Sequence, residues 1–187
     1  MDSVNGLSRI TLVLHWLVAI PMIGMLALGL YMTNLELFDY YDLHKSLGIL
    51  LGGVIVLRVI WRLRQGWLPP VANYAKSEML LARYTHWTLI ISTLLMPVSG
   101  MIMSGASGHG FDVFGLELVR ENPDPTHPDK VIAFNEFWSG FGETLHEYAG
   151  YILILAIVLH ILGALKHQFI YKDAILRRML GQNTKLK

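Results

Sequence analysis

Cysteine is absent from the 187-residue sequence. The chain therefore cannot form disulfides, thiolate metal sites, iron–sulfur clusters or a covalent C-x-x-C-H attachment to a prosthetic group. Any metal chemistry in this protein falls to histidine, of which the sequence has eight.

Charged residues are also scarce, at 16% of the chain against 53% apolar residues. The net charge is only +1, and no basic block long enough to follow phosphates lies outside the segments that flank the apolar runs. This composition excludes nucleic acid as a partner and is typical of membrane proteins, whose partner is lipid.

Long hydrophobic runs are the feature that the sequence does have. They cover residues 10–32, 43–63, 84–103 and 145–170, and each is close to the roughly 20 residues that a helix needs to cross a membrane. The first run is too long for a secretory signal and lacks a basic start and a cleavage site, so we expect it to remain in the mature protein. The pattern predicts one all-α membrane domain over residues 1–187, folded as an up-down transmembrane four-helix bundle.

The basic residues predict how this bundle is oriented. They concentrate at the N-terminus, between the second and third runs, and in the C-terminal tail, whereas acidic residues dominate the two other connections. By the positive-inside rule both termini are cytoplasmic.

The connections differ greatly in length. Residues 33–42 form a short outer loop, and Gly66, Pro69 and Pro70 end the second helix on the inner side. The long outer connection, residues 104–144, either carries a function or is a plain connector. Its aromatic stretch, residues 131–141, is expected to lie as a short helix over the outer end of the bundle.

Five histidines fall within the predicted spans, and this number is the main functional clue. They are His15, His44, His86, His146 and His160. Polar residues in a bilayer are costly, face the bundle interior and usually mark a functional site. A single one could instead make a hydrogen bond between helices.

The spacing of these histidines sorts them into two layers. His146 and His160 are 14 residues apart, which places them roughly 21 Å apart along one helix and within about 40° of the same face. His15 lies at a depth similar to that of His160, and His44 at a depth similar to that of His146. Two such pairs of imidazoles suit two six-coordinate haem irons that transfer electrons.

Other residues of the inner layer are candidates for supporting roles. His86 could replace one inner ligand, contact a haem propionate or a quinone, or simply pack. Arg9, Arg58 and Arg62 could pair with propionates, because guanidinium binds carboxylate bidentately, or could extend to the cytoplasmic surface. Glycines at helical spacing from the histidines leave room for a porphyrin, or alternatively for close helix packing. They are Gly48, Gly150 and Gly163.

At these residues the chain resembles the prokaryotic cytochrome b561 family, which is related to the cytochrome b subunits of nickel-iron hydrogenases. The matching pieces are Arg9 with His15-Trp16, His44 with Gly48, His86 with Pro97 and Gly100, and the stretch from His146 to Met179. The resemblance implies two haems b in a bacterial inner membrane, with His15 and His160 holding the inner haem and His44 and His146 the outer one. It also implies electron exchange with ubiquinone and places His167 at a quinone-side contact near the cytoplasmic face.

The resemblance leaves the outer partner open. Some members look like superoxide oxidases that pass an electron to ubiquinone, and others serve protein partners. The long acidic outer connection would repel superoxide unless Lys45, Arg120 or Lys130 provides a positive entry. The alternatives are a cytochrome b membrane anchor for a dehydrogenase or hydrogenase and, less favoured, a histidine-lined metal-ion transporter, for which the spans offer only Glu147 as a nearby acid.

Overall fold

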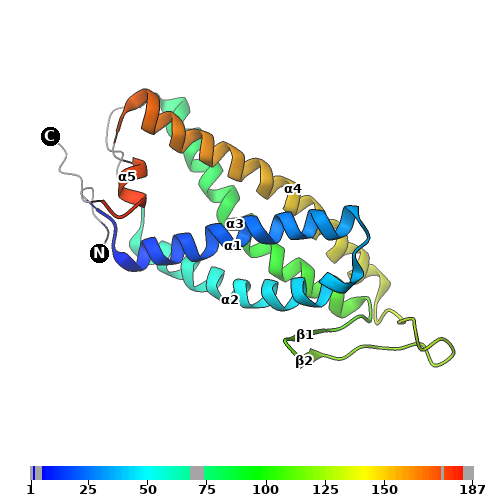
Figure 1. Ribbon diagram of the computed structural model, residues 1–187. Helices are drawn as coiled ribbons and strands as arrows, with labels where there is room; N and C mark the ends of the chain where they lie inside the picture. Colours follow the sequence, from blue (N-terminus) through cyan, green and yellow to red (C-terminus); the bar gives the residue numbers. More distant parts are fainter. Residues whose placement is uncertain (1, 3–5, 68–73, 174, 183–187) are drawn as a thin grey trace.

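Four long helices form the body of the protein in the computed structural model, which describes residues 2, 6–67, 74–173 and 175–182. They run up and down side by side (Figure 1), and each is long and apolar enough to cross a membrane. They are α1 (Arg9–Asn34), α2 (Tyr41–Gln65), α3 (Lys76–Ala106) and α4 (Glu136–Lys166). The prediction of an all-α, four-helix transmembrane fold is confirmed.

The helices extend beyond the apolar runs because polar residues form their ends. Ser8 caps α1 by accepting a hydrogen bond from the backbone N–H of Thr11. Asn135 caps α4 in the same way, so this helix begins at Glu136, nine residues before its predicted start. Gly66, at a φ of 70°, ends α2 at the predicted place. Hydropathy therefore located the membrane-crossing part of each helix but not its ends.

The apolar core lies at the middle of the bundle. Ile55 of α2 and Leu153 of α4 are 0% exposed. They form one cluster with five residues of α1, α2 and α3, namely Val18, Met22, Leu51, Val59 and Ile90. Most other large apolar side chains of the four helices point outward, as expected where lipid is the solvent.

Two glycines allow neighbouring helices to approach closely. A Cβ atom at Gly142 of α4 would lie 2.5 Å from the backbone nitrogen of Met103 on α3. A Cβ atom at Gly52 of α2 would lie 3.0 Å from Cβ of Pro97 on α3. These contacts also fix the relative heights of α2, α3 and α4.

The long outer connection is a β-structure rather than a helix. Strands β1 (Phe111–Val113) and β2 (Leu116–Val119) form an antiparallel hairpin that turns back beside the end of α2 (Figure 1). The helix predicted over residues 131–141 is wrong: residues 136–141 are the first turns of α4, and Val131 bridges to Pro123. The first outer loop contains a short 3-10 turn, η1 (Phe38–Tyr40).

The other end of α4 turns sharply back toward the bundle. Helix α4 continues into a π-helical turn, η2 (His167–Tyr171), and Lys172 then adopts a left-handed φ of 53°. The short helix α5 (Ile175–Met179) follows, and its last carbonyl accepts a hydrogen bond of 2.8 Å from the indole of Trp16. The chain thus starts α1 and ends α5 at the same end of the bundle, whereas the side of the membrane that this end occupies stays a prediction.

Candidate functional site

The structure gathers the five span histidines into two groups, one toward each end of the bundle. We call His44 with His146 the outer pair and His15 with His160 the inner pair, following the predicted orientation. The ring centroids of the outer pair are 6.3 Å apart, and those of the inner pair are 6.4 Å apart. Both predicted pairings therefore bring facing side chains together from different helices.

This separation suits a metal between two imidazoles. A metal bound at about 2.0–2.1 Å from one nitrogen of each ring, on opposite sides, holds the ring centres roughly 6 Å apart. A Cβ atom at Gly163, three residues beyond His160, would meet nothing within 4 Å. This open space indicates that Gly163 leaves room for a porphyrin rather than serving close helix packing.

Helix α3 orients the imidazole of His146. Its Nδ1 lies 3.0 Å from the backbone carbonyl oxygen of Met96 and 3.0 Å from Oγ of Ser99. When Nδ1 carries the proton and donates it to the carbonyl, Nε2 keeps its lone pair free for a metal. Gly100 permits this arrangement, since a Cβ atom there would lie 3.3 Å from Cε1 of His146.

The partner ring, His44, is positioned by packing against α1. A Cβ atom at Gly29 of α1 would lie 3.4 Å from Cε1 of His44, so the glycine leaves just enough room for the ring. The Nδ1 atom of His44 is buried and has no hydrogen-bond partner. Buried polar atoms of this kind are uncommon, so the structure leaves this ring nitrogen available to a bound group.

His86 joins the inner pair as a third imidazole. Its ring centroid lies only 5.2 Å from that of His160, in an edge-on arrangement. This is closer than two ligands on opposite sides of one metal can come, so the geometry favours His15 as the partner of His160. Trp67, which the sequence did not single out, lies 5.9 Å from the ring of His86.

Two of the three predicted arginines reach this inner group. The guanidinium of Arg58 lies 3.5 Å from Nδ1 of His15. Arg62 stacks over the ring of Trp67 at 4.6 Å. Arg9 is exposed at the first residue of α1, and the contacts among the described residues do not bring it to the histidines. Arg58 and Arg62 therefore lie beside the inner group of histidines, and Arg9 lies apart from it.

Gly48 and Gly150 could each accept a Cβ atom without a clash. A Cβ atom at Gly48 would meet Met25 at 3.6 Å, and one at Gly150 would meet Met96 at 3.7 Å, both ordinary contacts with flexible methionine side chains. Neither glycine is needed for close approach of helix backbones. In this bundle that role belongs to Gly52 and Gly142.

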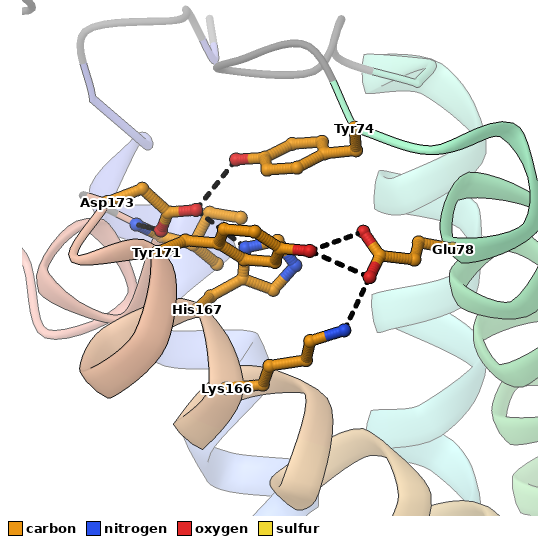
Figure 2. Close-up of polar contacts among 7 residues, drawn as sticks. Tyr74, Glu78, Lys166, His167, Tyr171 and Asp173 are labelled. Carbon is orange, nitrogen blue, oxygen red and sulfur yellow. Dashed lines mark hydrogen bonds and ion pairs between the residues drawn. The ribbon is translucent and has the colours of Figure 1, made fainter.

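His167 lies outside both pairs, in a polar cluster at the inner end of the bundle (Figure 2). Its Nδ1 is 2.6 Å from a carboxylate oxygen of Asp173, and the hydroxyl of Tyr74 donates to the same oxygen at 2.7 Å. The Tyr74 ring packs edge-on against His167, with ring centroids 4.9 Å apart. The left-handed turn at Lys172 brings Asp173 back to His167. The backbone N–H of Asp173 donates to the backbone carbonyl oxygen of His167 at 3.2 Å.

The charge state of this cluster follows from its hydrogen bonds. Burial by itself raises the pKa of Asp173, but the hydrogen bonds from Tyr74 and His167 outweigh burial and hold that pKa below its ordinary value of 3.8. Burial and the neighbouring carboxylate raise the pKa of Tyr74, so its hydroxyl remains a donor. Asp173 is therefore an ionised acceptor shared by an imidazole and a phenol.

A second carboxylate completes the cluster on the α3 side. Glu78 pairs with the ammonium of Lys166 and accepts hydrogen bonds of 2.7 and 2.8 Å from the hydroxyl of Tyr171 (Figure 2). The ring of Tyr171 lies 5.4 Å from that of His167. Sequence reasoning identified His167 but not its partners, because Tyr74 and Glu78 come from a distant part of the chain and Asp173 returns to His167 only through the turn at Lys172.

Comparison with known proteins agrees with these observations. The family model described as prokaryotic cytochrome b561 matches residues 6–182. Cytochrome b561 homolog 2 of Escherichia coli (strain K12) is 35% identical over 175 residues, which cover 91% of this chain and 88% of that protein. The probable superoxide oxidase CybB of Yersinia pestis is 23% identical over 176 residues, covering 89% of this chain and 91% of that protein. The chain therefore belongs to the prokaryotic cytochrome b561 family, whose members are membrane cytochromes that bind haem b and transport electrons.

Proposed function

We propose that this protein is a di-haem cytochrome that carries single electrons through the bundle, between a quinone at the His167 end and a redox partner at the other end. The observation that carries the proposal is the presence of two imidazole pairs with nearly equal ring separations, 6.3 and 6.4 Å. At this separation the two imidazoles of each pair could hold one haem iron between them, and the iron would supply one-electron chemistry.

In this proposal each histidine pair holds one haem b. The bound haem supplies an iron that gains and loses one electron, at a potential tuned by its ligands and their hydrogen bonds. His146 is held by the Met96 carbonyl, which makes its imidazole the more electron-rich ligand of the outer pair. Arg58 and Arg62 pair with propionates of the inner haem, and His86 lies beside the inner haem without ligating it.

The polar cluster around His167 is the proposed quinone contact, with ubiquinone as the expected substrate. Reducing one quinone to quinol takes two electrons and two protons, so the site must also handle protons. His167 is 22% exposed in its side chain and is hydrogen-bonded to an ionised carboxylate, which suits an imidazole that passes protons between solvent and a bound molecule. His167 also lies seven residues beyond His160, about 10 Å along the helix and on nearly the same face.

The partner at the outer pair is the least constrained part of the proposal. The name of the Yersinia pestis relative favours superoxide as the donor there. Oxidation of two superoxide ions to oxygen would release the two electrons that one quinone takes up. Lys45, one of the three predicted cations, follows His44 in the sequence and is already paired with Asp42 at 2.8 Å. A dehydrogenase or hydrogenase subunit is the second candidate partner.

Absorption spectroscopy of the purified protein tests the haem assignment. We expect two reducible haems b per chain, one of which is lost in His146→Ala and the other in His160→Ala. The control is His127→Ala, in the exposed outer connection, which should retain both. A single haem in the unaltered protein, or two in the His146→Ala and His160→Ala double variant, would overturn the proposal.

Rapid mixing then separates the possible partners. Reduction of the haems by quinol with no added protein is expected if the quinone contact is part of this chain. Reduction by superoxide, followed by electron transfer to ubiquinone, is expected if the outer partner is superoxide. Haem reduction by neither molecule would instead identify the chain as an anchor subunit that needs a protein partner.

A further inference from the structure

The hairpin β1–β2 exposes large apolar side chains where a soluble loop would carry polar ones. Phe114 is 64% exposed, Leu116 is 66% exposed and Leu118 is 50% exposed. All three lie within five consecutive residues at the tip and along the second strand. Exposing three large apolar side chains to water is unfavourable, and such exposure usually marks a surface that contacts a membrane or another molecule.

The hairpin folds back alongside the end of α2 rather than extending away from the bundle (Figure 1). Ser46, buried on α2, holds the tip in this position. Its Oγ donates to the carbonyl of Asp112 at 3.3 Å and accepts from the backbone N–H of Phe114 at 3.1 Å. The tip is thus fixed to α2 two residues deeper in the bundle than His44.

Contacts between helices show how deep this level is. Gly29 of α1 faces the ring of His44, because a Cβ atom there would lie 3.4 Å from Cε1 of the histidine. Leu30 and Tyr31 follow Gly29 on the outer side and are 42% and 52% exposed. Ser46 lies about 3 Å further in than His44. The tip of the hairpin, bonded to Ser46, therefore lies deeper than Leu30 and Tyr31, exposed apolar side chains of α1.

The backbone at the tip suits this depth. A backbone N–H without a partner is costly in lipid, and the two at the turn both have partners within the protein. The N–H of Phe114 is bonded to Ser46, and the N–H of Gly115 is bonded to a carboxylate oxygen of Asp112 at 2.8 Å. Phe114 and Gly115 both have positive φ values, as in the two-residue turns that join the strands of a tight hairpin.

The two faces of the hairpin differ in polarity. Asp112 pairs with Glu117 across the strands, so their side chains share one face, and Val113 pairs with Leu116 on the other face. Two neighbouring carboxylates require water or headgroups on their side, and the opposite side is apolar. This division is the one that an element lying in the membrane interface needs.

We propose that the β1–β2 hairpin is a re-entrant interfacial element that inserts Phe114 and Leu116 among the lipids of the outer leaflet, beside α2. The inserted tip anchors the outer connection against the membrane close to His44. The inference depends on the membrane span of the bundle and is independent of the proposed redox chemistry.

The absence of native cysteine makes a direct test possible. Phe114→Cys and, as the matched control in the same connection, Asp129→Cys are each labelled with a polarity-sensitive fluorophore and reconstituted into liposomes as haem-loaded protein. Lipids with a nitroxide on the upper acyl chain report contact with lipid, and iodide reports contact with water. We expect the lipid nitroxide to quench the probe at residue 114 and iodide to quench the probe at residue 129.

Two outcomes at residue 114 would overturn the proposal. Quenching by iodide to the same extent as at residue 129 would place the tip in water. Protection from both quenchers would mean that protein covers the tip, including a second copy of this chain. Leu116→Cys provides a second position with the same expectation, so the test does not depend on tolerance of the change at Phe114, and haem absorption verifies that each labelled variant is folded.

Discussion

The Nδ1 atom of His146 lies 3.0 Å from the backbone carbonyl oxygen of Met96. A ligand candidate on α4 is therefore aimed by the main chain of α3, at the helical turn that contains Pro97. This relationship explains why the segment from Pro97 to Gly100 matters although none of its side chains is a metal ligand in the proposal. It also determines where substitutions on α3 should act on the outer pair.

Gly100→Leu should remove the outer haem and leave the inner one. A Cβ atom alone would lie 3.3 Å from the His146 ring, and a leucine side chain must push the imidazole away from the Met96 carbonyl. The expected result is a decrease from two haems b per chain to one, measured by absorption spectroscopy. Gly53→Leu is the control, because a Cβ atom at Gly53 meets nothing within 4 Å. Equal loss of haem in both variants would contradict this account of Gly100.

His86→Ala should retain the inner haem, whereas His15→Ala should lose it. The reason is the ring separation from His160, which is 5.2 Å for His86 and 6.4 Å for His15. Because His86 lies beside the proposed haem, its removal should shift the reduction potential of that haem, which a redox titration measures. Loss of the inner haem in His86→Ala, with retention in His15→Ala, would reverse the ligand assignment.

Gly142→Ala should destabilise the bundle by forcing α3 and α4 apart. The added Cβ atom would lie 2.5 Å from the backbone nitrogen of Met103, which cannot rotate away as a side chain can. Overpacking of this kind costs about 1–3 kcal/mol, so the thermal midpoint in detergent should fall. Gly140→Ala, two residues earlier on the same helix and with nothing within 4 Å of its Cβ, should leave the midpoint unchanged.

Acid should release the C-terminal segment from the bundle. The pKa of Asp173 in the folded protein lies below 3.8, so its ionised form stabilises the fold above that ordinary value, and this contribution is lost as the pH falls through the lowered pKa. Limited proteolysis below about pH 4 should therefore cut near Lys172 increasingly as acid is added. Asp173→Asn should be cut at neutral pH as well, and an unchanged acid dependence in that variant would contradict the assignment.

The same carboxylate should matter for turnover with quinol. Asp173→Asn replaces the carboxylate that contacts Nδ1 of His167 at 2.6 Å with a neutral amide. Haem reduction by quinol should slow, while haem content stays at the unaltered level. Tyr74→Phe keeps the His167–Asp173 contact and should have the smaller effect. Equal slowing in the two variants would indicate only a structural role for Asp173.

Helical geometry explains why the histidine pairs could be predicted from sequence. The rise and rotation of an α-helix are nearly constant, so the spacing of His146 and His160 determines their depths and faces, and basic residues near the membrane surface extend that scale to the other helices. Helix ends were predicted less well, since the polar turns that complete α3 and α4 carry no hydropathy signal.

Contacts that depend on the tilt of a helix or on a turn could not be read in this way. The position of His86 relative to His160 depends on how far α3 leans toward α4, and no spacing along the chain encodes that tilt. The return of Asp173 to His167 depends on a left-handed residue, Lys172, that is not glycine and gives no turn signal. The hairpin was missed because its strands have only three and four residues, too few for an alternating pattern to stand out.

The dry middle of the bundle has an electrical consequence. Ile55 and Leu153 fill the space between the two histidine pairs with hydrocarbon, through which protons and other ions pass at high cost. An electron that moves between the pairs therefore crosses this layer without a compensating ion. Such a step is electrogenic, and each charge that traverses the whole membrane exchanges about 2.3 kcal/mol with the membrane potential per 100 mV. The direction of electron flow thus decides whether this small cytochrome charges the membrane or discharges it.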